Sequence, residues 1–195
     1  NTPTGFATAA FGGSGVSTIP GNYDLVFGNG GNDVQNSNGW ASTVFSGNGS
    51  DTIYVNRNSC VFLNETSAAS DTVVMQADNS NPYSYATVYG FDATGSVTND
   101  KLDLPSSLIA PDEFIVNGAD VNGLKSHSIA NGIVSFSATD LGGACVAINN
   151  SNLLDAINYL SQNFTTKGIT VGFAIDTNND GLNDSLGVFQ QRKIE

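Results

Sequence analysis

The sequence predicts a mainly β fold, in which a short parallel β-roll or β-helix is followed by a β-rich cap with one main α-helix. Two aspartates, Asp33 and Asp51, each follow a glycine-rich stretch and lie eighteen positions apart. Short segments of apolar or β-branched residues recur with half that spacing, and a fixed repeat of this kind is typical of solenoids. Residues 151–163 instead carry apolar side chains at helical spacing.

The repeat block covers residues 12–75 and is built from units of nine residues, each a turn followed by a short strand. One full coil of the roll then takes two units, or eighteen residues, so that alternate units stack on the same side. The units begin at the following positions, the last of them two residues late: Asp24, Asp33, Ser42, Asp51, Cys60 and Asp71.

Stacking of alternate units places columns of apolar side chains inside the roll. In this register Gln35 also takes an inner position, which it fits poorly because its amide group is polar. The inner columns are expected to hold Val26, Val44 and Phe62 on one sheet and Ile53 and Val73 on the other.

The turns before Asp33 and Asp51 have the residue types of a calcium site. Glycine adopts positive φ angles without strain, so glycine-rich loops bring backbone carbonyls close together. Carboxylate and carbonyl oxygens are hard ligands, which suit Ca²⁺ better than Zn²⁺. A glycine- and asparagine-rich β-hairpin without metal is the alternative interpretation of the same residues.

Three stretches match the nonapeptide G-G-x-G-x-D-x-U-x, in which U is large and apolar. Residues 47–53 match well, residues 28–35 match less well, and residues 12–19 carry Ser17 in place of the aspartate. The block therefore resembles the RTX, or haemolysin-type, calcium-binding proteins. That resemblance implies one Ca²⁺ between same-side turns, held by the carbonyls of Gly28, Gly30, Gly47 and Gly49 and the carboxylates of Asp33 and Asp51.

Residues 1–91 are interpreted as the roll with its lead-in and closing strand, and residues 92–195 as the cap, in one continuous domain. The segment VYGFDATGSVTNDKLDLP resembles the stretch that follows the repeats in type I-secreted proteins. Asp92, Asp100 and Asp103 either hold another ion there or form a solvated acidic turn, which is the favoured interpretation. Short strands are expected at 114–116, around 129, at 133–137 and at 144–148, separated by Asn-Gly turns.

Residues 151–163 are expected to form the main helix. Leu153, Leu154, Ile157 and Leu160 recur at helical spacing, and Asp155 lies in the first turn, where the helix dipole favours an acid. A strand at 169–175 and its hairpin partner at 186–189 follow. This arrangement resembles the C-terminal cap of RTX surface and S-layer-like proteins, and a cap protects strand edges that an open roll exposes.

The loop of that hairpin reads D-x-N-x-D-G-x-x-D, which resembles the first nine positions of an EF-hand loop. Gly187 stands where an EF-hand has its last glutamate, so the loop is at most a related calcium site. A bare Asn/Asp turn is the alternative. The expected ligands are the side chains of Asp176, Asn178, Asp180 and Asp184 and the carbonyl of Leu182.

Composition excludes several classes of function. Eighteen acidic residues face six basic ones, for a net charge of −12, which argues against binding nucleic acid or anionic membrane. No apolar run is long enough to span a bilayer. The single histidine, His127, is expected in a loop with a surface or structural role, and Cys60 and Cys145 form either a disulfide or two free thiols.

The chain carries no HExxH, G-x-S-x-G or P-loop motif, so an enzyme is not expected. The resemblance implies a calcium-binding extracellular structural protein of the bacterial surface, an S-layer or matrix unit that folds on Ca²⁺ after type I secretion. Self-assembly into a lattice or filament and contact with cell-surface polysaccharide are the expected partnerships. The alternatives are the C-terminal module of a larger RTX protease or lipase, and a carbohydrate-binding adhesin module.

Overall fold

The computed structural model describes residues 9–11, 16–19, 25–37, 41–56, 58–63, 69–76, 85–92 and 99–192. These residues are mainly β with one helix, which confirms the predicted fold class. The chain divides into two compact units, Asn1–Pro105 and Ser106–Glu195. The first unit thus extends beyond residue 91, because strand β10 (Lys101–Asp103) pairs with the strands of the roll.

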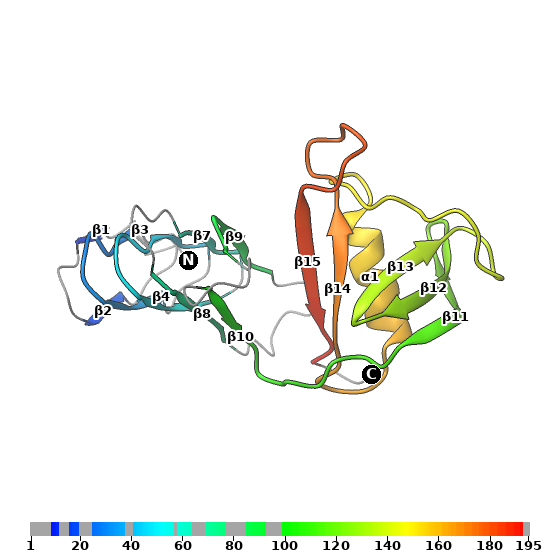
Figure 1. The fold of residues 1–195 in the computed structure, drawn as a ribbon, viewed down its shortest axis with the longest axis horizontal. Helices are drawn as coiled ribbons and strands as arrows, with labels where there is room; N and C mark the ends of the chain where they lie inside the picture. Colours follow the sequence, from blue (N-terminus) through cyan, green and yellow to red (C-terminus); the bar gives the residue numbers. More distant parts are fainter. Residues whose placement is uncertain are drawn as a thin grey trace, which may run out of the picture. The chain divides into compact units, whose positions relative to one another are not determined.

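The first unit is a solenoid of two parallel sheets (Figure 1). Its first sheet has the strand order β1-β3-β5-β7-β9, and its second sheet has the order β10-β8-β6-β4-β2. Consecutive strands therefore alternate between the two sheets, as the nine-residue units predict. The remaining strands are β1 (Ala9–Phe11), β2 (Val16–Ile19), β3 (Leu25–Phe27), β4 (Val34–Ser37), β5 (Thr43–Phe45), β6 (Thr52–Val55), β7 (Cys60–Phe62), β8 (Thr72–Met75) and β9 (Thr87–Tyr89).

The eighteen-residue coil holds in the middle of the roll, whereas Ala9 pairs with Leu25 at a separation of sixteen. Leu25 pairs with Thr43, and Val34 with Thr52, both at a separation of eighteen. Thr43 then pairs with Cys60, one residue sooner, so the register shifts by one position in β7. Because successive strand residues point to opposite faces, this shift exchanges the inner and outer side chains of β7.

The shift decides which residue of β7 enters the core. Val61 is fully buried beside Val44, so the prediction that Phe62 lies inside the roll is wrong. Phe62 instead belongs to an outer stack of four rings with centroids 4.8 to 5.0 Å apart: Phe27, Phe45, Phe62 and Tyr89. The other inner residues, Val26, Val44, Ile53 and Val73, are buried as predicted.

Gln35 does take the inner position, in register with Ile53. Its side chain is 1% exposed, and its amide donates to the carbonyls of Phe45 and Ser46, both at 3.2 Å. These two hydrogen bonds offset the cost of burying the amide N–H groups. Gln35 therefore connects β4 of the second sheet to the end of β5 and to the turn that follows it in the first sheet.

The second unit is a five-stranded sheet, of order β11-β12-β13-β14-β15, with a helix on one face (Figure 1). Strands β11 to β13 form an antiparallel meander, α1 crosses to the parallel strand β14, and β15 returns as a hairpin. The elements are β11 (Glu113–Val121), β12 (Leu124–Ala130), β13 (Ile133–Ser137), α1 (Leu153–Asn163), β14 (Thr170–Ile175) and β15 (Ser185–Gln190).

The turns of the meander follow the Asn-Gly dipeptides only in part. Asn122-Gly123 and Asn131-Gly132 have positive φ at both residues, as tight hairpins require. Asn117-Gly118 lies within β11 instead, so the predicted turn there is wrong. The predicted strand at 144–148 is also wrong, because that segment makes only a bridge between Ser137 and Cys145.

Helix α1 begins two residues later than predicted and ends where expected. Ala156, Tyr159 and Leu160 are buried against the sheet, whereas Leu154 is 59% exposed and lies off the apolar face. Each unit has its own hydrophobic core. No helix among the described residues is long and apolar enough to cross a membrane.

Candidate functional sites

Four aspartates stack at one edge of the roll, each directly before a strand of the second sheet. We call Asp33, Asp51, Asp71 and Asp100 the aspartate column. The backbone N–H of each donates to the carboxylate of the next: Asp33 to Asp51 Oδ1 at 2.7 Å, Asp51 to Asp71 Oδ1 at 2.8 Å, and Asp71 to Asp100 Oδ1 at 2.9 Å. The column therefore joins four successive coils through charged acceptors.

The column lies in the interior of the turn. Asp33, Asp51 and Asp71 are at most 2% exposed. Burial raises the pKa of Asp51 to about 6; its neighbours Asp71 and Asp33 add repulsion, and the Asp33 N–H opposes the rise. Asp51 Oδ2 is buried without a hydrogen-bond partner among the described residues. Such an oxygen is costly to desolvate unless a proton or a cation compensates its charge.

The glycine-rich loops that precede Asp33 and Asp51 stack against each other. Gly31 N donates to Asn48 O at 2.9 Å, and Asn48 N donates to Asn29 O at 3.0 Å. Gly49 has a φ of +122°, and a Cβ there would lie 2.2 Å from Gly31 O. Glycine is thus required at this position both by the backbone angle and by the closeness of the next coil.

The structure brings the predicted ligands Gly28, Gly30, Asp33, Gly47, Gly49 and Asp51 together on neighbouring coils. Their donor atoms are all oxygens, and the buried, unbonded Asp51 Oδ2 fits a hard cation. Asp51 Oδ1, by contrast, already accepts the Asp33 N–H. Within the described ranges, no three acidic, histidine or cysteine residues form a metal-holding group. The six-oxygen calcium site remains a prediction.

The predicted repeat register includes Asp71, two residues late, but the predicted calcium ligands include neither Asp71 nor Asp100. Both are followed by the same pattern, one residue and then an inward apolar side chain: Val73 after Asp71 and Leu102 after Asp100. That pattern was the available signal, but longer loops move these two residues away from the eighteen-residue spacing. Of the other acids considered near Asp100, Asp103 is exposed in β10, and Asp92 N donates to Asp100 Oδ2 at 2.8 Å.

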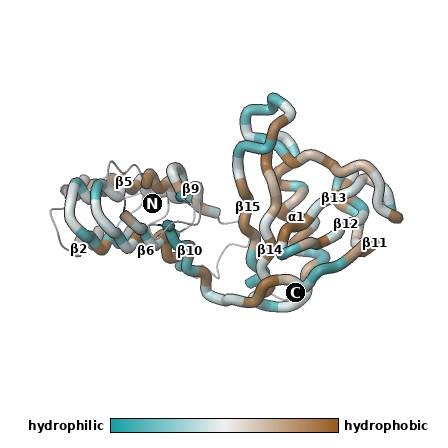
Figure 2. The backbone as a smooth tube through the Cα atoms, viewed as in Figure 1, coloured by the Kyte–Doolittle hydropathy of each residue, from teal (hydrophilic) through white to brown (hydrophobic). Residues whose placement is uncertain are grey.

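The loop between β14 and β15 is mostly hydrophilic (Figure 2) and is organised by Asp176. The Asp176 carboxylate accepts N–H groups from Asn179 at 2.6 Å, Asp180 at 3.2 Å and Gly181 at 2.8 Å. Asn178 Oδ1 accepts from Asp180 N, and Asp180 Oδ1 accepts from Leu182 N. The loop's own amides therefore fix its conformation.

Asp184, the last predicted ligand of this loop, faces Thr177. Its Oδ1 accepts the Thr177 N–H at 3.0 Å and the Thr177 hydroxyl at 2.7 Å. These bonds lower the pKa of Asp184, so it stays ionised. The hydrogen bonds made by Asp176 and Asp184 account for the loop without an ion, as in the Asn/Asp-turn interpretation, and calcium there remains a prediction.

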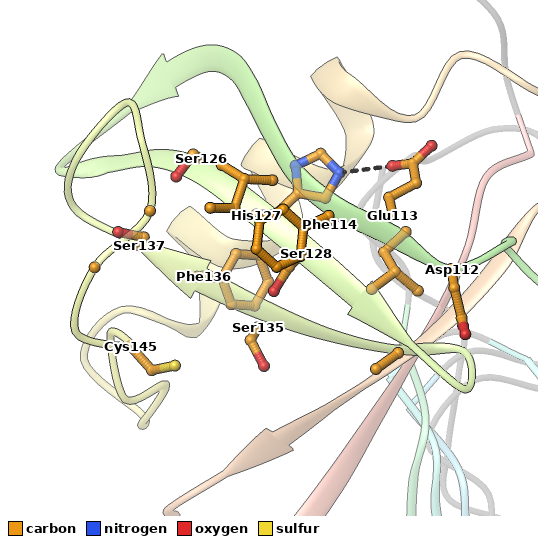
Figure 3. Close-up of a pocket in the computed structure, with 15 residues that line it drawn as sticks. Asp112, Glu113, Phe114, Ser126, His127, Ser128, Ser135, Phe136, Ser137 and Cys145 are labelled. Carbon is orange, nitrogen blue, oxygen red and sulfur yellow. Dashed lines mark ion pairs between the residues drawn. The ribbon is translucent and has the colours of Figure 1, made fainter.

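His127 lies in β12, not in a loop as expected, and is 4% exposed. Its Nδ1 is 3.0 Å from the hydroxyl of Tyr159 on α1, and its Nε2 is 3.4 Å from Glu113 Oε2 (Figure 3). Burial lowers the pKa of His127, and Glu113 opposes that shift. Burial and the charge of Asp120 raise the pKa of Tyr159 to about 12. The single histidine thus links the sheet to the helix.

The two cysteines are free thiols, Cys60 in β7 of the first unit and Cys145 in the second unit. Comparison of the chain with family models, curated proteins and solved structures gave no match. The resemblance to RTX proteins therefore rests on the nonapeptides in the sequence.

Proposed function

We propose that this protein is a calcium-dependent extracellular structural protein of the bacterial surface, an S-layer or matrix unit. The observation that carries the proposal is the aspartate column, in which stacked carboxylates are buried beside glycine-rich turns. Because a net charge of −12 makes copies of the chain repel one another, their assembly would require a divalent cation that neutralises part of this charge. Assembly into a lattice or filament follows from the same chemistry.

The column explains how calcium would control folding. Without a cation, four neighbouring carboxylates repel one another and oppose closure of the roll. An ion between the turns of Asp33 and Asp51 would supply the positive charge that the buried Asp51 Oδ2 lacks. Sites of even ~10⁻⁴–10⁻³ M affinity fill at extracellular calcium levels, and an ion that binds only the folded state stabilises it by mass action. Folding would therefore follow export.

Far-ultraviolet circular dichroism during thermal melting tests this proposal in EGTA, in excess Ca²⁺ and in excess Mg²⁺. We expect a gain of β signal and of Tm that is specific to Ca²⁺. Asp51→Asn should lose most of that gain while melting no lower than the wild type in EGTA, because it removes one buried charge. Asp103→Asn, on an exposed side chain of the same unit, is the matched control and should respond like the wild type.

A calcium response of Asp51→Asn equal to that of the wild type would contradict the proposed role of the column. Electron microscopy of the protein at millimolar Ca²⁺ addresses assembly separately. Ordered sheets or filaments are expected, and dispersed monomers under those conditions would exclude the lattice function while leaving the calcium-dependent fold intact.

A further inference from the structure

The β12–β13 hairpin carries four serines on one face. Ser126 lies directly opposite Ser137, and Ser128 directly opposite Ser135. The residues between them, His127 and Phe136, point to the other face, where both contact the ring of Tyr159 on α1. We call these four residues the serine face. Ser126 and Ser137 are buried, whereas Ser128 is half-buried and Ser135 is exposed.

A pocket of about 550 Å³ lies over the serine face (Figure 3). Residues 112–115 contribute one side of its lining, and the segment that includes Gly142, Gly143 and Cys145 contributes another. Phe114, in the lining, is 88% exposed. The volume is within the range of small-molecule sites.

The second side of the pocket is held in place by hydrogen bonds to the serine face. Ser126 Oγ donates to Thr139 O at 2.6 Å, and Ser137 Oγ accepts the Thr139 N–H at 3.2 Å. Thr139 Oγ1 in turn donates to Gly142 O at 2.6 Å. A pocket whose wall is already fixed loses little conformational entropy when a ligand enters it.

The chemistry of the lining selects among ligands. Ser128 and Ser135 make no side-chain hydrogen bond to other described residues, and a hydroxyl both donates and accepts. Asp112 and Glu113 are the charged residues of the lining, which contains no lysine or arginine, so an anionic ligand would be repelled. The exposed face of Phe114 offers an electron-rich surface to C–H groups. This combination fits a neutral ligand that alternates hydroxyl and C–H groups.

We propose that this pocket binds a neutral saccharide, with Ser128 and Ser135 of the serine face hydrogen-bonding its hydroxyls and Phe114 stacking on the sugar ring. The site lies entirely in the second unit and does not depend on calcium binding by the aspartate column. It gives a structural protein of the cell surface a means of contact with uncharged glycans.

Chemical-shift titration of the ¹⁵N-labelled full chain tests the proposal. The neutral probes are maltotriose, cellotriose and tri-N-acetylchitotriose, with trigalacturonate as the anionic counterpart, each at millimolar concentration in saturating Ca²⁺. At least one neutral trisaccharide should shift amides of residues 112–115, 126–128, 135–137 and 142–145, and trigalacturonate should not. Absence of shifts with all three neutral probes, shifts confined to other residues, or equal binding of trigalacturonate would overturn the proposal.

Two variants compare a lining side chain with one outside the pocket. Phe114→Ala should weaken binding of the active trisaccharide by about tenfold, since it removes the stacking surface. Leu141→Ala is the matched control, because Leu141 is similarly exposed at 85% but does not line the pocket. Both side chains are exposed, so both variants should fold. Equal affinity of Phe114→Ala and Leu141→Ala would overturn the role assigned to Phe114.

Discussion

At the scale of single residues, each unit buries a titratable group, and the two groups have opposite effects on how stability depends on pH. The folded first unit holds Asp51 with a raised pKa, so it binds protons more readily than the unfolded chain does. The folded second unit holds His127 with a lowered pKa, so it binds protons less readily. Stability therefore shifts in opposite directions as the pH falls.

For the second unit, we expect stability to be full above the unfolded-state pKa of about 6.5 and to fall as the pH drops below it. Protonation must place a charge in a nearly dry site between Tyr159 and Glu113, and Glu113 offsets only part of that cost. His127→Gln retains a hydrogen-bonding side chain but does not titrate. Hydrogen exchange of β12 and α1 should therefore depend less on pH in this variant than in the wild type; an equal dependence would contradict the assignment.

For the first unit in EGTA, the sign is reversed. Lowering the pH from about 6 toward 3.8 should stabilise the roll, because the folded state takes up a proton on Asp51 that the unfolded state does not. Hydrogen exchange of β4, β6 and β8 measures this directly. Asp51→Asn should remove most of the gain, and a roll that instead loses protection over this range would contradict the prediction.

Two glycines of the stacked loops differ in how closely the neighbouring coil approaches them. Gly49→Ala would place a Cβ 2.2 Å from Gly31 O at a φ of +122°, whereas Gly30→Ala meets its nearest atom at 4.0 Å. We expect Gly49→Ala to destabilise the roll by about 3 kcal/mol or more, and Gly30→Ala by less than about 1 kcal/mol. Urea unfolding in Ca²⁺ measures both, and similar values would contradict the observed contact between the loops.

At the scale of elements, the register of β7 is the feature that sequence periodicity misassigns. A coil of seventeen residues instead of eighteen brings Val61 inside and moves Phe62 to the outer ring stack. A tyrosine already occupies an outer position of this ring stack, because Tyr89 stacks on Phe62. The two faces of β7 therefore differ in their tolerance of a hydroxyl group.

This difference gives a test of register by two small substitutions. Val61→Thr buries a hydroxyl in an apolar core and should cost about 1–3 kcal/mol. Phe62→Tyr adds a hydroxyl on the solvent side and should change the free energy of unfolding by less than about 0.5 kcal/mol. Urea denaturation distinguishes them, and the opposite order would show that Phe62 faces the core.

At the scale of the whole molecule, the two units have separate hydrophobic cores and different dependence on ions. The roll contains the aspartate column, whereas the second unit is stabilised by a core that comprises, among its described residues, fourteen buried apolar ones, including Tyr159, Phe136 and Phe173. The second unit should thus remain folded where the roll does not.

Hydrogen exchange with mass spectrometry tests this separation in EGTA and in excess Ca²⁺. Removal of calcium should increase exchange across residues 25–103 and leave residues 113–175 protected. Any calcium effect in the second unit should be confined to the loop at 176–184. Loss of protection throughout both units in EGTA would contradict the independence of the second unit.

The sequence by itself determined the class of fold and the identity of most elements. A repeat of nine residues dictates alternation between two parallel sheets, and helical spacing locates α1, because both patterns are local in the chain. The turn aspartates Asp33 and Asp51 were recognisable for the same reason. Their regular spacing is a direct consequence of one coil stacking on the next.

Only the tertiary structure decided how segments separated by irregular loops come into register. It placed Val61 rather than Phe62 in the core, added Asp71 and Asp100 to the aspartate column, and buried His127 between β12 and α1. It also aligned the serines of β12 and β13 into one face. Strand pairing depends on contacts between distant residues, and a one-residue change in loop length reverses which side chains face inward.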